Sequence, residues 1–497
     1  MFPPNRMLAA SLAAAGGLLL ALAFPRAGVA VLAPVGAAAL FLAWHRASWK
    51  RSFALGWFAG LIFFTISFWW WSTSIKTEVG ALAYVAVVIA AAIEALSIGA
   101  AGVLAALVTR RAPAALAPLG AAAAFTIAEW TRSIGQLGVP FAQLGYTQAE
   151  TPLRAIAAYA GTIGLTFVIC ILGAYGADAI ARRVWRPFAA AGALVVVTAV
   201  AAWGAWPART VAAPTIPVVA VQGNIAQSLK WQPNMLESTV ERYTAMTRSA
   251  IATDPKLVVW PETVIAINGG GLNQYPELLA RFAQLARSGD ATLVAGSVEI
   301  RGVSSYNTLY FFTPAGLTAT YEKRQLVPFA EHFPGQAFLS WLPYVGQLNG
   351  NFAEGSANGV TPTSAGITVG SLICWESAFG DIAFQEVRDG AQALVIATDD
   401  AWFGTSSGPY QHAQIAQLRA IESGEYVVRA AATGISGIIA PDGSWTSRAP
   451  LEVQENVFGK IGLPAGSAFA HIGPMRVFFA IIALYLALVL VPWRERA

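Results

Sequence analysis

Cysteine and charge are both scarce in this sequence. The 497 residues include two cysteines, and charged residues make up 12% of the chain while hydrophobic residues make up 56%. A soluble domain carries about 25% charged residues. Two cysteines exclude a disulfide framework, and the apolar composition excludes a disordered chain. We therefore predict an integral membrane protein.

Histidines are also few, and they are scattered along the chain. None of the four has a neighbour at the spacing of a metal ligand, and no nucleotide-binding motif is present. We predict neither a metal nor a cofactor. His332 follows Glu331 directly, and we expect it to have a local structural or gating role. The four histidines are His45, His332, His412 and His471.

Long apolar runs fill the first 208 residues. A membrane-spanning helix needs about 20 mostly apolar residues. Seven stretches approach that length in residues 1–208, and an eighth lies in the C-terminal segment 471–497, so we predict eight transmembrane helices. The first follows Arg6 and resembles a signal peptide, but six more follow it directly, and we expect it to stay uncleaved. The stretches are Met7–Phe24, Ala27–Trp44, Ser52–Trp71, Val79–Val108, Ala114–Ala128, Leu153–Ala181, Pro187–Trp203 and Val477–Val491.

Basic residues alternate between the predicted loops. Residues 1–208 hold 13 basic and 5 acidic side chains, so this excess follows the membrane segments and does not indicate nucleic-acid binding. Positive residues stay on the cytoplasmic side. Both termini should then be cytoplasmic, and the segment after the seventh helix should be periplasmic in a bacterium with two membranes. The basic clusters are Arg6; Arg46, Lys50 and Arg51; Arg110 and Arg111; Arg182, Arg183 and Arg186; and Arg494 and Arg496.

Polar and aromatic residues interrupt this apolar region in three places. Residues 129–152 are too polar to span and should form an arm at the outer face. The aromatic run 68–71 belongs either to a headgroup belt or to a surface where lipid enters. Glu94 lies mid-helix, where a carboxylate is often functional, although a neutral packing role is equally compatible with the sequence.

Residues 209–470 have shorter apolar runs separated by turns. Alternating strands and helices predict a layered α/β domain. The expected strands are Ile216–Gln222, Leu257–Trp260, Thr292–Ile300, Thr308–Phe312, Ile367–Ile373, Ala393–Ala397 and Gly437–Ala440. The expected helices are Met235–Ala252, Tyr275–Ser288, Phe379–Asp389 and Gln411–Ser423.

Three segments of this domain carry potential chemistry. Glu262 follows an apolar strand and a proline; Lys323 is one of six lysines in a chain with 25 arginines; Cys374 ends another apolar strand. A strand-edge cysteine can use turn N–H groups to stabilise a thiolate or an oxyanion. Taken singly, each residue also has an ordinary interpretation: a turn glutamate, a solvated lysine and a buried structural cysteine. Cys170, among apolar neighbours, should only pack.

Taken together, the three segments resemble the Glu–Lys–Cys triad of the nitrilase superfamily, in the order Glu262, Lys323, Cys374. That resemblance implies a four-layer α-β-β-α sandwich. A domain of this kind between seven helices and an eighth resembles apolipoprotein N-acyltransferases. Further matches are Gln222–Ile225 with Lys230-Trp231, Leu326–Glu331, Asp399–Gly404, Gly408–His412, Thr433–Ser436, Glu129–Ser133 and Gln143–Tyr146. The chain departs from the family pattern at Ala330 (glycine), Trp375 (often tyrosine) and Asp399 (asparagine).

The resemblance implies acyl transfer from a phospholipid to the N-terminal amine of a diacylglyceryl-modified apolipoprotein. Glu262 would be the base, Cys374 the nucleophile that forms a thioester, and Lys323 an oxyanion donor. Glu331 should orient Lys323, and Glu376 should shape the turn behind the nucleophile, beside Trp375. Trp231 should serve the second substrate.

Two other functions stay open at this stage. The same triad with water as second nucleophile would make a membrane-tethered amidase, and a receptor or transporter with an extracytoplasmic domain would need no triad. We expect a monomer in the inner membrane.

Overall fold

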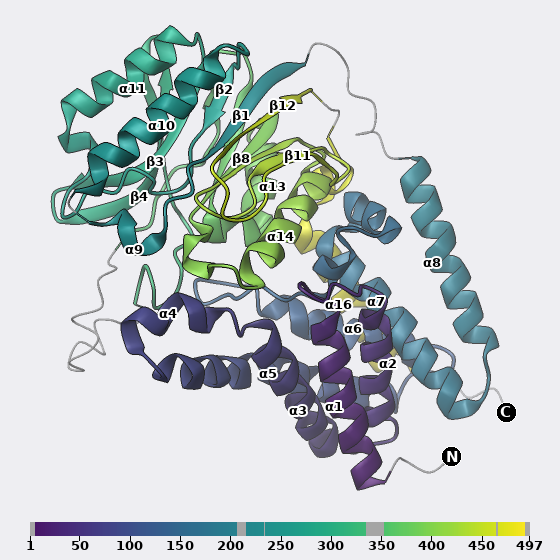
Figure 1. Cartoon of the computed structure of the whole chain (residues 1–497). Helices are drawn as coiled ribbons and strands as arrows, with labels where there is room; N and C mark the ends of the chain where they lie inside the picture. The colour runs from purple at the N-terminus through teal and green to yellow at the C-terminus, as the bar shows by residue number, and fades with distance from the viewer. Residues whose placement is uncertain (1–4, 206–214, 233, 334–351, 464–465, 493–497) are drawn as a thin grey trace.

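The computed structural model describes residues 5–205, 215–232, 234–333, 352–463 and 466–492. The predicted domain boundary at 208/209, Arg494 and Arg496 lie outside these residues. The described chain has two halves, a helical half and an α/β domain stacked on it (Figure 1).

The helical half contains a helix at each predicted apolar stretch. Small residues allow these helices to approach closely: a Cβ on Gly56 would lie 2.4 Å from the carbonyl oxygen of Ile98 on a neighbouring helix. The helices are α1 (Arg6–Leu22), α2 (Leu32–Trp44), α3 (Trp49–Ser67), α4 (Trp71–Val79), α5 (Leu82–Val108), α6 (Ala117–Thr131), α7 (Ala157–Arg182), α8 (Arg186–Gly204) and α16 (Pro474–Leu490).

Only some of these helices are long and apolar enough to cross a membrane. Among the described residues, α5, α8 and the segment Pro152–Arg182, which ends in α7, meet both conditions, and α3 with α4 makes a fourth if the bent pair is one span. Helices α1, α2 and α16 are apolar but shorter. The number of eight spans therefore stays a prediction.

Several boundaries of the predicted helices differ from the observed ones: the second was expected to begin at Ala27, but α2 begins at Leu32. We expected the third to run to Trp71, but α3 ends at Ser67 and the chain turns by 61° into α4. Aromatic packing accompanies the break, since Phe68 stacks on Trp71 with ring centroids 4.5 Å apart.

The α/β domain holds two six-stranded sheets. The first has the order β12-β1-β2-β3-β4-β5 and the second β11-β10-β9-β8-β7-β6. Strands β1, β2 and β3 are parallel, as are β7, β8 and β9. The first sheet comprises β1 (Ile216–Gln222), β2 (Leu257–Val259), β3 (Thr292–Arg301), β4 (Ser304–Thr313), β5 (Gly316–Glu322) and β12 (Glu455–Ile461). The second comprises β6 (Thr361–Pro362), β7 (Thr368–Ile373), β8 (Ala393–Thr398), β9 (Val427–Ala431), β10 (Gly437–Ile439) and β11 (Trp445–Arg448).

Apolar side chains join these sheets and their helices into four layers. The two sheets face each other through a core that includes Val259 and Val395. Helices α10 (Met235–Ile251) and α11 (Pro276–Ser288) cover the first sheet through Tyr243 and Phe282. Helices α13 (Gly380–Arg388) and α14 (Gly408–Ser423) cover the second. The predicted α-β-β-α sandwich is confirmed.

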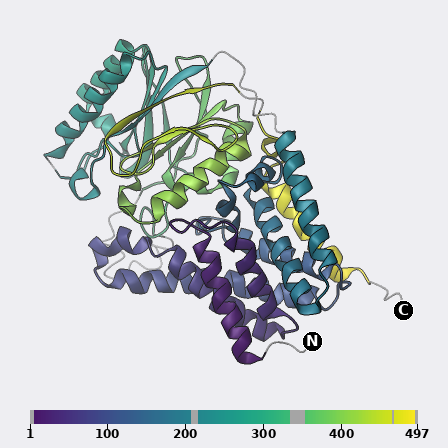
Figure 2. The same cartoon turned by 45° about the vertical axis from the view of Figure 1, so that its right-hand side comes forward.

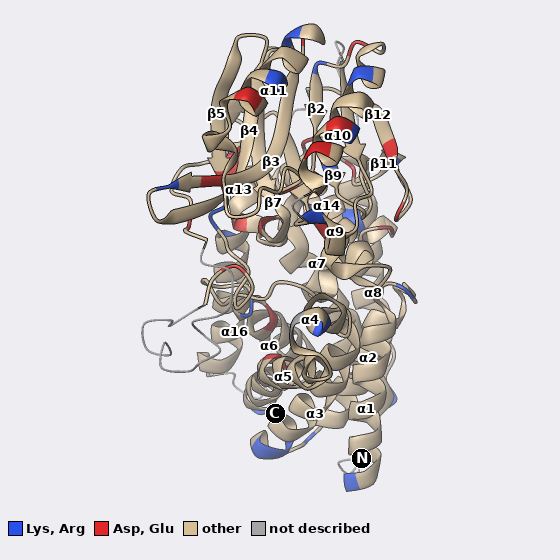
Figure 3. Cartoon of the chain, turned by 60° about the vertical axis from the view of Figure 1, so that its left-hand side comes forward, with Lys and Arg blue, Asp and Glu red and all other residues tan. Residues whose placement is uncertain are grey.

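Helix α14 joins the two halves of the molecule. Ala416 and Ala420 pack on the second sheet, whereas Ile415, Leu418 and Ile421 belong to the same core as the helical half. Figure 2 shows α14 between the sheets and the membrane helices. Charged residues are frequent in the α/β domain and sparse in the helical half, where Lys and Arg lie mainly at the helix ends and a few acidic residues lie within (Figure 3). One apolar core therefore runs from the helical half into the α/β domain.

A buried ion pair adds a polar contact at this junction. Helix α7 is broken at Gly161, which has a φ of 65°. Glu422 of α14 accepts hydrogen bonds from the backbone N–H of Thr162 (2.6 Å) and from its hydroxyl (2.8 Å). Arg419 lies 2.8 Å from Glu422 and also donates to Thr162. A side chain of the α/β domain thus caps the broken end of a membrane helix.

Candidate active site

Glu262 and Lys323 meet inside the α/β domain although 61 residues separate them. Glu262 lies three residues after β2, and Lys323 follows β5 directly. Lys323 Nζ is 3.1 Å from Glu262 Oε1, and both side chains are buried. Burial alone would raise the pKa of Glu262, but the charges of Lys323 and Lys230 hold it below its ordinary value. The carboxylate is therefore ionised and ready to accept a proton.

Asn307 and Glu331 also contact the Glu262–Lys323 pair. Asn307 Nδ2 donates to Glu262 Oε1 (2.7 Å) and to Glu331 Oε1 (3.0 Å). Glu331 Oε1 is 2.8 Å from Lys323 Nζ. Burial alone would lower the pKa of Lys323, but Glu262 and Glu331 raise it. Asn307 was not predicted from the sequence, because it lies among polar and apolar residues of β4 with no pattern that marks it.

Cys374 lies at the end of β7, where the short 3-10 helix η5 (Cys374–Ala378) begins. Its φ is +50°, a left-handed conformation that costs a non-glycine residue about 1–3 kcal/mol. The thiol is nearly enclosed, with 8% exposure. Burial raises its pKa well above the ordinary value, the charge of Glu262 adds to the rise, and Lys323 opposes it. The charges of Glu262 and Lys323 thus shift the pKa of this thiol in opposite directions.

Glu376 ties the nucleophile turn to the segment after Lys323. Its Oε2 accepts the backbone N–H of Ile373 at 2.7 Å, and its Oε1 accepts that of Arg324 at 2.6 Å. The hydroxyl of Tyr321 donates to both oxygens. The side chain has no exposed surface. It holds two loops of the site together.

A second buried network lies behind the backbone of Cys374. The Ser377 hydroxyl donates to the Cys374 carbonyl (2.8 Å), and His412 Nε2 lies 3.1 Å from the same oxygen. His412 Nδ1 is 2.8 Å from Asp400, which pairs with Arg429 at 2.6 Å. The spacing is similar to a Ser–His–Asp triad. However, Ser377, His412 and Asp400 have no exposed surface, so the network holds backbone and does not attack substrate.

Trp375 and Trp231 lie on different sides of the site. Trp375 is buried and stacks on Phe141 of the arm, with centroids 4.9 Å apart and planes 17° apart. Trp231 is 37% exposed, at the end of the short helix α9 (Gln227–Lys230). The arm segment 129–152 thus reaches the residue that follows Cys374, while Trp231 faces outward.

The departures from the family pattern have different settings. Ala330 is exposed, and its N–H donates to the Val327 carbonyl. Asp399 is buried and directly contacts the site, because its backbone N–H donates to Glu262 Oε2 (2.8 Å). The departure from the family pattern predicts a changed local hydrogen bond that leaves the triad untouched, but Asp399 contacts Glu262 through its N–H and Lys230 through its carboxylate.

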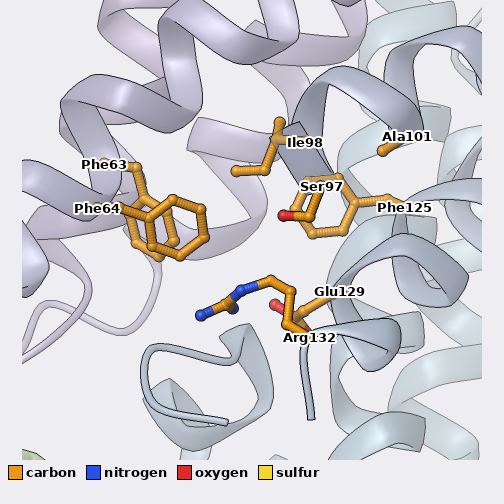
Figure 4. Close-up of a pocket in the computed structure, with 8 residues that line it drawn as sticks. All are labelled: Phe63, Phe64, Ser97, Ile98, Ala101, Phe125, Glu129 and Arg132. Carbon is orange, nitrogen blue, oxygen red and sulfur yellow. The ribbon is translucent and has the colours of Figure 1, made fainter. Parts of the chain in front are cut away.

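A small pocket lies in the helical half, apart from Cys374 (Figure 4). Phe63, Phe64 and Phe125 line it with Arg132 and Glu129. Arg132 pairs with Glu94 at 2.5 Å and donates to the carbonyls of Val139 and Phe141 in the arm. Glu94 therefore has a charged partner. Cys170 is buried in α7, and no group of three or more possible metal ligands occurs among the described residues.

Comparison with known proteins follows the same division of the chain. The carbon-nitrogen hydrolase family matches residues 218–465, and the apolipoprotein N-acyltransferase N-terminal domain matches residues 16–175. The apolipoprotein N-acyltransferase of Methylococcus capsulatus is 33% identical over 469 residues, which cover 93% of this chain and 92% of that protein. The chain belongs to the apolipoprotein N-acyltransferase family. It is an acyltransferase with a nitrilase-like domain.

A second relative agrees with this assignment. The apolipoprotein N-acyltransferase of Geobacter metallireducens is 32% identical over 484 residues, 92% of this chain and 90% of that protein. Among solved structures, Nit3 of Saccharomyces cerevisiae, a nitrilase-superfamily member, is 19% identical with a TM-score of 0.40 and covers 57% of this chain and 97% of its own.

Proposed function

We propose that this protein transfers a fatty acyl chain from a phospholipid to the N-terminal amine of diacylglyceryl-modified apolipoproteins, through a thioester on Cys374. The observation that carries the proposal is the buried pair of Glu262 and Lys323, whose charges both act on the Cys374 thiol. Family membership supports the substrate class.

In the first half-reaction Glu262 takes the thiol proton as the sulfur attacks the ester carbonyl. Lys323 and the backbone N–H of Trp375 stabilise the negative oxygen; loss of one such donor costs about 10²–10³ in rate. The C–O bond then breaks, and Glu262 returns the proton to the departing oxygen. The products are a thioester and a lysophospholipid.

In the second half-reaction the neutral α-amine of the lipoprotein attacks the thioester carbonyl. Glu262 accepts a proton from the amine, the C–S bond breaks, and the proton passes to the departing sulfur. Cys374 is restored as a thiol and the acceptor carries an amide. We propose that Trp231, on the exposed side of the site, contacts this second substrate.

We also propose the orientation of the chain in a bacterial inner membrane. Eight helices would span it, both termini would be cytoplasmic, and residues 209–470 would lie in the periplasm. Lys and Arg at the ends of the helices remote from the α/β domain (Figure 3) support this orientation. The site would then face the outer leaflet, where ester and amine groups of both substrates are available. We propose that a single copy suffices, because all three triad residues come from one chain.

The test is to give purified full-length protein a phospholipid labelled in its acyl chain, with no acceptor. We expect a base-labile adduct on Cys374, which decays when a diacylglyceryl-peptide is added and appears as labelled amide. Cys374→Ser should form no thioester, whereas the control Cys170→Ala should behave like the parent. Release of free fatty acid without transfer would favour a hydrolase. Full function in Cys374→Ala would favour a receptor or transporter.

A further inference from the structure

A buried ion pair lies beside Glu262 outside the triad. Lys230 Nζ is 2.5 Å from Asp399 Oδ2, and the two side chains are 5% and 2% exposed. The same ammonium donates to the Thr263 hydroxyl at 2.7 Å and to the Glu262 carbonyl at 3.3 Å. These three contacts of the lysine therefore lie at or next to the base.

Asp399 contacts Glu262 from the other side. Its backbone N–H donates to Glu262 Oε2 at 2.8 Å, while its side chain holds Lys230. The pair thus fixes both the main chain and the carboxylate of Glu262. Lys230 is also the last residue of α9, and its Nζ lies 6.0 Å from the centroid of the Trp231 ring. The tryptophan that we assign to the second substrate is therefore attached to the residue that holds the base.

We propose that Lys230 and Asp399 are positioning residues of the acyl transfer, which hold Glu262 in place, balance the charge around it and anchor the helix that carries Trp231. This inference rests on the proposed function, because it gives the pair a role in the use of Glu262 as a base.

The charge balance follows from the groups that face Glu262. Positive Lys230 favours its ionised form, and negative Asp399 opposes it. An opposite charge within about 4–6 Å lowers a carboxyl pKa by about 1–3 units. Removal of one member of the pair therefore leaves the other uncompensated beside the base. The remaining charged or titratable groups around Glu262 and Asp399 are Lys323, Glu331, Cys374 and Tyr243.

The test measures the rate of acyl-enzyme formation against pH for full-length variants. In Lys230→Met the charge of Asp399 is unopposed, so the acid limb of the profile should move up by about one pH unit and the rate at neutral pH should fall. In the double variant Lys230→Met/Asp399→Asn the acid limb should return toward the parent. Asp399→Asn alone leaves Lys230 unopposed, so its acid limb should move down.

The matched control is Lys256→Met, which removes a lysine that pairs with Asp254 and Asp290 on the surface. Its profile should equal that of the parent. The proposal would be overturned if Lys230→Met and the double variant lost the same fraction of the acylation rate and neither shifted the acid limb. Lys230 would then only pack. If Lys230→Met fails to fold, the Asp399→Asn variant decides: an acid limb equal to that of the parent would overturn the proposal. If the parent forms no acyl-enzyme, the proposed function fails instead.

Discussion

Single side chains at this site act through the partners that hold them. Glu262 shares one oxygen between Lys323 and Asn307, and its other oxygen accepts the N–H of Asp399. A buried carboxylate with both oxygens engaged is held in one orientation. A proton that it takes would have to come from a group that this orientation faces, and in the proposed mechanism that group is the Cys374 thiol.

Glu331 is the residue whose loss should most directly affect Lys323. In Glu331→Gln the Lys323 ammonium loses one of two carboxylate partners, so its orientation is less fixed and its charged form is less stabilised. We expect acyl-enzyme formation to slow about tenfold or more, with little change in the KM for phospholipid. Stopped-time labelling of Cys374 measures the rate. Glu241→Gln, on an exposed ion pair with Arg281, is the control. A parent-like rate in Glu331→Gln would show that Lys323 needs only Glu262.

Trp231 should separate the two half-reactions. Its ring is partly exposed, and we assign it to the acceptor, so Trp231→Ala should acylate Cys374 at nearly the parent rate. The thioester should then decay several-fold more slowly when diacylglyceryl-peptide is added, because an amphipathic contact for the acceptor is gone. The measurement traps the labelled thioester and follows its loss. If the variant fails to acylate Cys374, Trp231 is needed in the first half-reaction. If its thioester decays at the parent rate, Trp231 does not contact the acceptor.

The sequence pointed to the candidate catalytic residues but not to all of the residues that contact them. Glu262 and Cys374 stand at strand ends, where a local pattern is informative. Asn307 is 45 positions from the carboxylate it holds, and no local pattern reveals such a contact. Asp399 shows the same limit, since only the fold brings its N–H to Glu262.

At the level of structural elements, the turn after β7 depends on support from α14. Cys374 has a strained backbone, and its carbonyl accepts the hydroxyl of Ser377 next to His412. Such strain persists only where the surroundings fix it. Asp400 and Arg429 hold the histidine from behind, so this network should decide whether the nucleophile keeps its conformation.

Asp400 gives this network a pH signature. Burial would raise its pKa, but Arg429 and His412 hold it at about 2, below the ordinary 3.8. A depressed pKa stabilises the fold above pH 3.8, and the contribution of about 2 kcal/mol is lost as the pH falls through about 2. Asp400→Asn should lose this pH dependence and also destabilise the fold by about 3–5 kcal/mol at neutral pH. Thermal unfolding between pH 2 and 7 measures both, with exposed Asp254→Asn as control. An unchanged acid transition would show that other carboxylates govern it.

The arm is a second supporting element. Arg132 fixes the carbonyls of Val139 and Phe141, and Phe141 stacks on Trp375. We expect Phe141→Ala to destabilise the protein by about 3–5 kcal/mol, as for other buried aromatic residues, and to slow acyl-enzyme formation. Phe141→Leu keeps most of the volume and should recover most of both. The melting temperature and the acylation rate measure these effects. Equal acylation in all three proteins would confine the arm to a structural role.

The elements themselves were only partly predictable. Every expected strand and helix of the α/β domain has a counterpart, but β5, β6, β9, β11 and β12 were missed. Strand β12 is largely polar and pairs with β1 more than 200 residues earlier, so its strand state is set by the partner. Strand β9 follows α14 after a short turn. It was missed because its residues could equally continue the preceding helix. The helix break after Ser67 could not be predicted, because neither proline nor glycine occurs in residues 67–71.

At the scale of the whole molecule, the two halves share one apolar core, and Arg419 and Glu422 of α14 bond Thr162 of α7. Loss of Glu422 should leave Arg419 without its carboxylate and the broken end of α7 uncapped. Glu422→Ala should therefore lower stability by about 3–5 kcal/mol and uncouple the α/β domain from the helices. In calorimetry we expect one transition for the parent and two for the variant. A single transition for both would show that apolar packing alone joins the halves.

The enclosure of Cys374 also matters for redox chemistry. Outside the cytoplasm a thiol meets oxidants and disulfide exchange, and it reacts with them chiefly as an accessible thiolate. The Cys374 thiol is nearly enclosed and has a raised pKa, so at rest it stays protonated and shielded. The other cysteine, Cys170, is buried in a membrane helix. In the proposed periplasmic location, this enclosure would shield the resting sulfur from sulfenic acid and mixed disulfide formation.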